Sequence, residues 1–259
     1  MKLFAYISAI AALFLVACGG GGSDSSSSST STTSSYTGKG STVLNLDWST
    51  HTNPDGSSHQ ALTNSITLET AKDATLVPVT YPNTNNWLTS ISSTIAGMSS
   101  GQILNLSAGV TGDAYGTLSI PSPTPNVLIS IAAGNSDEAT LTSGIRSALY
   151  NSGYRNNLIL VGALRNGSIN GSTAGAAADR FVVADGACTG TAYYGTSCSA
   201  PRIAGYAAII KEKYPNATGE QIASAILNTA VLQPGWDSAT YGRGKADLNA
   251  ALNYLGTAK

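Results

Sequence analysis

Charged side chains are scarce in this 259-residue chain, at 10 % of its residues, and the net charge is only −1. With 13 Lys and Arg against 14 Asp and Glu, the chain has no excess of cations for a surface that binds nucleic acid or anionic lipid. We therefore expect no nucleic-acid partner. Polar character comes instead from Ser, Thr, Asn and Gly, which is typical of exported proteins.

Histidine and cysteine are also rare. The only histidines are His51 and His59, so a reaction that needs an imidazole base has two candidates. The three cysteines are Cys18, Cys188 and Cys198. In an oxidising compartment Cys188 and Cys198 can form a disulfide that contributes about 2–3 kcal/mol. The alternative is two buried free thiols. No metal site is predicted.

The chain has one long apolar run, at residues 3–17, directly after Lys2. This run is shorter than the roughly 18 residues of a membrane-spanning helix, and its layout is that of a secretory signal. It ends in Leu-Val-Ala-Cys-Gly at residues 15–19, which resembles a bacterial lipobox. The resemblance implies that Cys18 is lipidated after cleavage and anchors the protein in the bacterial cell envelope, at the outer membrane or cell surface. The alternative is an ordinary signal peptide with an incidental cysteine.

Residues 19–40 are almost entirely Gly, Ser and Thr. Such a segment cannot bury enough surface to fold, so we expect a flexible tether between the signal at residues 1–18 and a folded domain at residues 41–256. About 216 residues suffice for one domain with a substantial core.

Strand and helix patterns alternate along this domain. Strands are predicted at residues 41–47, 74–79, 102–107, 127–133, 158–164 and 181–184. Helices are predicted at residues 59–70, 86–98 and 145–151, from the region of Ser197 to about 214, after a capping box at Thr218 and Gln221, and at 247–254. The alternation predicts an α/β fold in three layers, with a mostly parallel central sheet and helices on both faces.

In parallel sheets, functional groups gather beyond the carboxyl ends of the strands. Asp47 and residues 107–109 lie at the ends of predicted strands, and the pair Gly134-Asn135 directly follows another. Ser197 is placed differently, after Gly195 and Thr196 and ahead of an apolar run. This predicts a serine in the first turn of a buried helix, where free backbone N–H groups stabilise negative charge.

The segment at residues 195–205 resembles the nucleophile motif of the subtilisin-like serine proteases, or subtilases. Ser58-His59-Gln60-Ala61 is similar to the histidine motif of that family, and Asp47 ends a strand as the family's aspartate does. The resemblance implies a catalytic triad of Asp47, His59 and Ser197. Asp55 is the alternative acid, but a turn explains it. We interpret His51 as a solvated side chain of the loop.

Two strand ends complete the resemblance. Residues 131–135 are similar to the family strand whose terminal asparagine stabilises the oxyanion, which implies that role for Asn135. The substrate-binding residues implied by the resemblance are Ser107, Ala108 and Gly109 on one wall and Ala133 and Gly134 on the other.

The sequence thus predicts a monomeric serine endopeptidase that cleaves protein or peptide substrates through an acyl-enzyme. It uses no cofactor, although the resemblance allows calcium at an unidentified site. Only eleven residues separate Asp47 from His59, fewer than subtilases usually have, and Arg202 stands where the family often has a non-catalytic histidine. Two alternatives therefore stay open: a degenerate subtilase that binds peptides or envelope material without cutting, and an esterase that uses the same triad.

Overall fold

The computed structural model describes residues 35–48, 51–53, 55–81, 87–107, 119, 126–142 and 144–257, all within one compact unit, Ser34–Lys259. The predicted signal sequence with Cys18, residues 19–34 of the predicted tether, Ala108 and Gly109 lie outside the described residues. No helix among the described residues is long and apolar enough to cross a membrane.

Seven strands form one sheet in the order β2-β1-β3-β4-β5, with β7 also paired to β5. These pairs are all parallel, and only the short strand β6 pairs antiparallel to β5. The mostly parallel α/β fold predicted from the sequence is therefore confirmed. The strands are β1 (Thr42–Trp48), β2 (Thr75–Tyr81), β3 (Ile103–Leu106), β4 (Leu128–Ala132), β5 (Leu158–Arg165), β6 (Ser168–Asn170) and β7 (Phe181–Asp185).

The helices also follow the predicted order. They are α1 (His59–Thr70), α2 (Trp87–Gly97), α3 (Gly144–Tyr150), α4 (Thr196–Lys213), α5 (Gly219–Thr229), α6 (Ser238–Tyr241) and α7 (Leu248–Thr257). Short 3-10 turns lie at Thr140–Thr142, Arg155–Asn157 and Gly175–Arg180. The predicted capping box of Thr218 and Gln221 is present at the start of α5. The four-residue α6 was not predicted.

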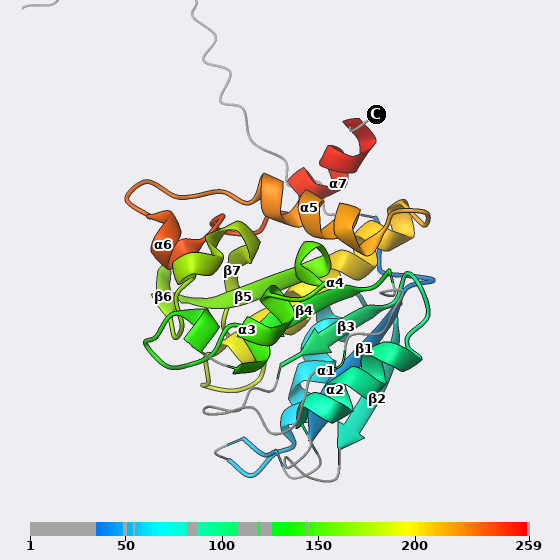
Figure 1. Ribbon diagram of the computed structural model, residues 1–259, viewed down its shortest axis with the longest axis horizontal. Coiled ribbons are helices and arrows are strands. Elements are labelled where there is room, and N and C mark those ends of the chain that lie inside the picture. The colour runs from blue at the N-terminus through cyan, green and yellow to red at the C-terminus, as the bar shows by residue number, and fades with distance from the viewer. Residues whose placement is uncertain are drawn as a thin grey trace, which may run out of the picture. The chain divides into compact units, whose positions relative to one another are not determined.

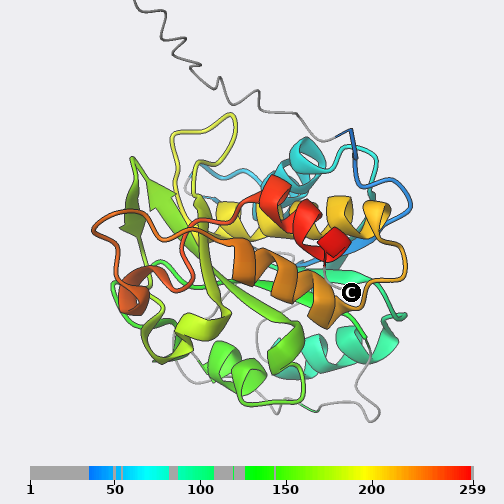
Figure 2. The ribbon, with the colours of Figure 1, turned by 90° about the horizontal axis from the view of Figure 1, so that it is seen from above.

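Alternate residues of the buried strands belong to two separate cores. On β4, Leu128 and Ala132 pack with α4, α5 and α7, whereas Ile129 and Ile131 pack with α2 and α3. Figure 1 shows α2 and α3 in front of the sheet, and Figure 2 shows them on the side opposite α4. This double burial explains why the strands read as continuous apolar runs instead of alternating patterns.

The helices that carry His59 and Ser197 in their first turns lie in close contact. A Cβ atom on Gly205 of α4 would be only 2.6 Å from the Cβ of Thr70 in α1, so glycine is required where the helices touch. Ser58 caps α1, because its side chain accepts a hydrogen bond from the N–H of Ala61. The cap starts α1 at His59, and the close packing holds α1 against the helix that carries Ser197.

Candidate active site

Asp47 and His59 form a buried pair at the carboxyl end of β1. The His59 Nδ1 atom lies 2.6 Å from Asp47 Oδ2, and the two side chains are 7 % and 0 % exposed. Asp47 is placed there by the apolar strand before it, and His59 by the N-cap at Ser58. The structure thus brings together the predicted acid and the predicted base across a loop of only eleven residues.

His51 lies in the same cluster, so its interpretation as a solvated side chain is wrong. Its Nδ1 atom is 2.9 Å from Asp47 Oδ1, and its ring stacks on that of His59 with centroids 3.6 Å apart. The short loop folds back on itself, since the N–H of His59 donates to the carbonyl oxygen of His51. The sequence of this loop is polar and has no hydrophobic periodicity, so its closure could not be predicted.

Opposing effects act on the Asp47 carboxyl group. Burial raises its pKa, but hydrogen bonds from His51 and His59, together with the charges of both rings, outweigh burial and lower the pKa below its ordinary value of 3.8. Asp47 is therefore a carboxylate at neutral pH. A carboxylate holds the proton of His59 on Nδ1, which leaves Nε2 as the acceptor that a general base needs.

Ser197 lies in the first turn of α4. Its hydroxyl donates to the carbonyl oxygen of Ser107 at 2.8 Å, and the hydrogen bonds of the described residues include none between Ser197 and His59. The backbone N–H of Ser197 is one of the donors at a helix start that have no partner within the helix. The structure therefore places the predicted nucleophile against the predicted substrate-binding residue Ser107.

Asn135 is fixed in orientation by Thr196. The Asn135 Oδ1 atom accepts from the backbone N–H of Thr196 at 2.9 Å and from its hydroxyl at 3.0 Å. A backbone N–H can only donate, so this assigns the oxygen to the α4 side and directs the amide Nδ2 donor elsewhere. Thr196 Oγ1 also accepts from the N–H of Gly134 at 3.2 Å. Sequence reasoning missed this linking role of Thr196.

The predicted substrate-binding residues lie at two strand ends. Ser107 follows β3, while Ala133 and Gly134 follow β4; Ala108 and Gly109 lie outside the described residues. Gly134 has φ +112°, and a Cβ atom there would be 2.7 Å from the Ser172 hydroxyl. No other residue fits this position, which accounts for a glycine next to Asn135.

The loop before Ser197 is fastened at several points. Cys188 and Cys198 are joined by a disulfide with a Cα–Cα distance of 5.3 Å, which resolves the alternatives left by the sequence. Arg202 donates to the carbonyl oxygen of Ala187 at 2.7 Å and lies near Glu69 of α1. The disulfide and the Arg202–Ala187 contact connect the loop to the first turns of α4, and the Glu69 contact connects α4 to α1.

Asp47, His51 and His59 are also the group that could hold a metal ion among the described residues, since their ligand atoms lie within 4.8 Å of one another. Both Nδ1 atoms already contact the carboxylate. An ion at this point would displace the hydrogen bond that orients His59. Asp55, the alternative acid, lies in an exposed turn and contacts Ser57 instead.

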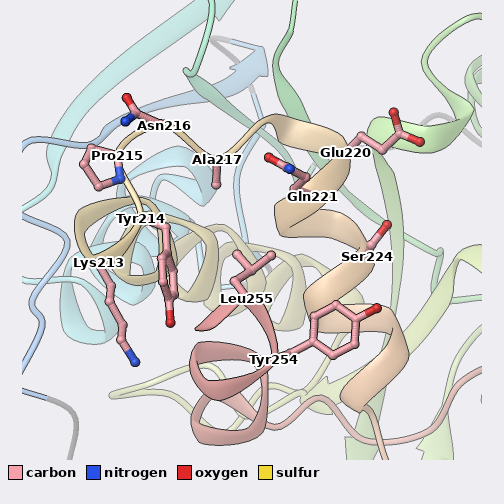
Figure 3. Close-up of a pocket in the computed structure, with 10 residues that line it drawn as sticks. All are labelled: Lys213, Tyr214, Pro215, Asn216, Ala217, Glu220, Gln221, Ser224, Tyr254 and Leu255. Carbon is pink, nitrogen blue, oxygen red and sulfur yellow. The ribbon is translucent and has the colours of Figure 1, made fainter. Parts of the chain in front are cut away.

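A pocket of about 620 Å³ lies elsewhere in the domain. It is formed by the carboxyl end of α4 together with α5 and α7, and Tyr214, Gln221 and Leu255 are among its lining residues (Figure 3). None of the predicted site residues lines it. We therefore place the chemistry at the strand ends and not in this pocket.

The fold and site define a three-layer α/β protein that carries the residue types of a serine hydrolase at the carboxyl edge of its sheet. The model of the subtilase family (Peptidase S8) matches residues 10–249. The chain belongs to the subtilase family.

Curated relatives agree with this assignment over part of their length. The chain is 30 % identical to subtilisin DY of Bacillus licheniformis over 133 residues, which are 48 % of this chain and 46 % of the relative. It is 30 % identical to subtilisin E of Bacillus subtilis over 159 residues, or 58 % of this chain and 40 % of the relative. The chain thus spans about half the length of the curated relatives it matches.

Solved structures show the same fold at lower identity. A protease from Pseudoalteromonas arctica PAMC 21717 has a TM-score of 0.58 at 20 % identity, covering 85 % of this chain and 91 % of that one. MycP1 without its N-terminal propeptide has a TM-score of 0.59 at 19 % identity, covering 84 % and 92 %. At these identities the likeness concerns the fold alone.

Proposed function

We propose that the protein is a serine endopeptidase with a catalytic triad of Asp47, His59 and Ser197. The observation that carries the proposal is the buried contact of 2.6 Å between His59 Nδ1 and Asp47 Oδ2, on a subtilase fold whose nucleophile motif supplies Ser197. Paired with a carboxylate, the imidazole is oriented to take a proton at Nε2. Membership of the subtilase family supports peptide bonds as the substrate.

In the proposed reaction, His59 takes the proton of the Ser197 hydroxyl as Oγ attacks the scissile carbonyl carbon. Before this, the hydroxyl must exchange its acceptor, the Ser107 carbonyl, for His59. The Asn135 amide and the Ser197 N–H stabilise the oxyanion. His59 then protonates the leaving amine, an acyl-enzyme forms on Ser197, and water activated by His59 releases the acid. No step uses a metal or a cofactor; that the protein needs no cofactor stays a prediction, and calcium is left open by the resemblance to the family.

Extended peptides suit the surface at the strand ends. Pairing between β3 and β4 ends at Leu106 and Ile131, which leaves a gap between the two strand ends where the proposed extended peptide would lie. Ser107, Ala133 and Gly134 are the described members of this surface. One copy of the chain suffices for this mode of binding, and the monomeric state stays a prediction.

A fluorophosphonate or peptidyl phosphonate probe tests the proposal. It should label the native protein, while Ser197→Ala should remain unlabelled and keep the native circular-dichroism spectrum. Ser199→Ala is a matched control, because Ser199 lies on the same helix but donates to backbone carbonyl oxygens of the core. If the well-folded native protein is not labelled, the proposed enzymatic activity is excluded.

One observation favours the binding alternative, namely the Ser197 hydroxyl bonded to Ser107 instead of His59. Catalytic hydrogen bonds are often absent before substrate binds, so this contact does not exclude catalysis. Casein and short acyl esters, assayed side by side, separate the three functions. An endopeptidase cleaves casein, an esterase only the esters, and a binding protein retains peptides but cleaves neither.

We also propose that the protein is lipid-anchored through Cys18 at the extracytoplasmic face of a bacterial membrane. The lipobox-like sequence supports this, and so does the point at which the chain enters the domain. The N–H groups of Thr37 and Gly38 donate to the Glu212 carboxylate near the carboxyl end of α4. Ser197 lies fifteen residues earlier on the helix, about 22 Å away, so tether and nucleophile are at opposite ends. Cys18→Ser should release the protein from the membrane fraction without loss of probe labelling.

A further inference from the structure

Arg146 on α3 is a buried cation with no acidic partner among the described residues. It is 7 % exposed, and the ion pairs of the described residues do not include it. Burial lowers its pKa to about 10, so the guanidinium remains protonated at neutral pH. Charged side chains this deeply buried are almost always paired, which makes the unpaired Arg146 a feature that needs a cause.

The guanidinium reaches the gap between the ends of β3 and β4. Its Nε atom donates to the carbonyl oxygen of Ala132 at 2.6 Å. The N–H of Ala133, in the same peptide unit, donates to Val161 of β5. The two groups of a trans peptide point in opposite directions, so the Ala132 carbonyl points toward β3. The last residue of β4 that pairs with β3 is Ile131, one residue before Ala132. The Ala132 carbonyl therefore has no partner on β3, and Arg146 binds it in the space between the two strands.

The end of the side chain lies beside Gly134. A Cβ atom on Gly134 would be 3.3 Å from Arg146 Nη1. Among the described hydrogen bonds, only Nε of Arg146 has an acceptor. The terminal nitrogens are not among the fully enclosed polar atoms that lack a partner, so they keep some exposed surface although the residue as a whole is buried. A partly exposed pair of charged donors is thus held next to the residue that precedes Asn135.

We propose that Arg146 selects substrates with Glu or Asp immediately before the scissile bond. This rests on the proposed function, in which Asn135 binds the oxyanion formed from the carbonyl of that residue. The side chain of that substrate residue and the carbonyl that becomes the oxyanion belong to the same residue. When Asn135 binds the oxyanion, the side chain therefore lies close by, in the gap beside Gly134. A carboxylate there meets the planar donor fork of arginine. An apolar side chain would cover the guanidinium without pairing it, which is unfavourable.

Two peptides that differ only in Glu or Gln before the cleaved bond test this proposal in the full-length protein. Because a charge-assisted hydrogen bond replaces a weaker one, kcat/KM should be about 10- to 100-fold higher for the Glu peptide. Arg146→Met keeps an unbranched apolar stem in place of the aliphatic part of the side chain and removes the charge, and should bring the ratio near one. Arg243→Met removes an exposed arginine and should leave the ratio unchanged.

A ratio near one in the native protein would overturn the proposal without any variant. So would a loss in Arg146→Met that is equal for both peptides, because that indicates a structural role toward Ala132. If Arg146→Met does not fold, Arg146→Lys retains the charge and should retain the preference for Glu at a reduced ratio.

Binding separates this proposal from the proposed function. In Ser197→Ala, which cannot form an acyl-enzyme, fluorescence anisotropy should show tighter binding of the Glu peptide than of the Gln peptide. The preference should disappear in Ser197→Ala/Arg146→Met. A preference in binding with no cleavage by the native protein would contradict the endopeptidase but retain Arg146 as the selecting group. Cleavage without a preference between the two peptides would support the endopeptidase and contradict the role of Arg146.

Discussion

The rings of His51 and His59 are stacked with centroids 3.6 Å apart, and their Nδ1 atoms contact the two oxygens of the Asp47 carboxylate. The second histidine therefore binds the carboxylate oxygen that the proposed base leaves free. It also covers one face of the His59 ring. Both contacts restrict how the Asp47–His59 pair can move, which is a positioning effect and not a direct part in the reaction.

Replacement of the two histidines should have unequal effects. His59→Ala removes the general base and should lower kcat by about 10⁴-fold or more. His51→Ala removes one hydrogen bond to a charged group, about 1.5 kcal/mol, and should lower kcat by about tenfold with little change in KM. Steady-state kinetics on one peptide substrate measure both effects.

His51→Asn provides the control, because an asparagine amide can still donate to Asp47. It should recover much of the activity that His51→Ala loses. Full activity of His51→Ala would show that the contact with Asp47 is incidental. A greater loss in His51→Ala than in His59→Ala would make His51 the base.

Stability should depend on pH through Asp47. Its pKa in the folded protein is below 3.8, so near pH 4 the unfolded chain binds more protons at this site than the folded one. The stability that the ionised group contributes is complete above the unfolded value and is lost as pH falls through the lower, folded value. Urea unfolding should show a difference in the free energy of unfolding between the native protein and Asp47→Asn that narrows below about pH 4. A difference independent of pH would contradict the lowered pKa.

Removal of the disulfide should destabilise the loop that carries the nucleophile. Cys188→Ala/Cys198→Ala should reduce the free energy of unfolding by about 2–3 kcal/mol, which lowers Tm by about 5–10 °C for a domain of this size. Calorimetry of the native protein with and without a reductant gives the matched comparison, and the reductant should not change the Tm of the double variant. An unchanged Tm on reduction would show that the bridge contributes nothing.

The parts of the site that follow regular elements were predictable from the sequence. Asp47 follows a buried apolar strand, His59 follows a capping serine, and Asn135 follows another buried strand. Because the carboxyl ends of parallel strands share one edge of the sheet, strand ends in the sequence become neighbours in space. The alternation of strands and helices likewise predicted three layers, because helices that connect parallel strands cover the faces of the sheet.

The roles that sequence reasoning missed, those of His51, Arg146 and Thr196, depend on contacts that no local sequence pattern encodes. His51 reaches Asp47 because the loop closes on the N–H of His59, and a polar loop has no pattern that predicts such closure. Arg146 is buried because the end of β4 leaves a carbonyl that β3 does not reach. From sequence, an arginine on a short helix is expected at the surface.

Asn135 has two roles, and two substitutions separate them. Its Oδ1 atom accepts from the start of α4, and its Nδ2 is the proposed oxyanion donor. Asn135→Ala removes both, whereas Asn135→Asp keeps an acceptor for Thr196 and removes the donor. Both should lower kcat by about 10²–10³-fold with little change in KM, but only Asn135→Ala should also lower Tm. If Asn135→Asp retained the native kcat, the oxyanion would have to be stabilised by another donor.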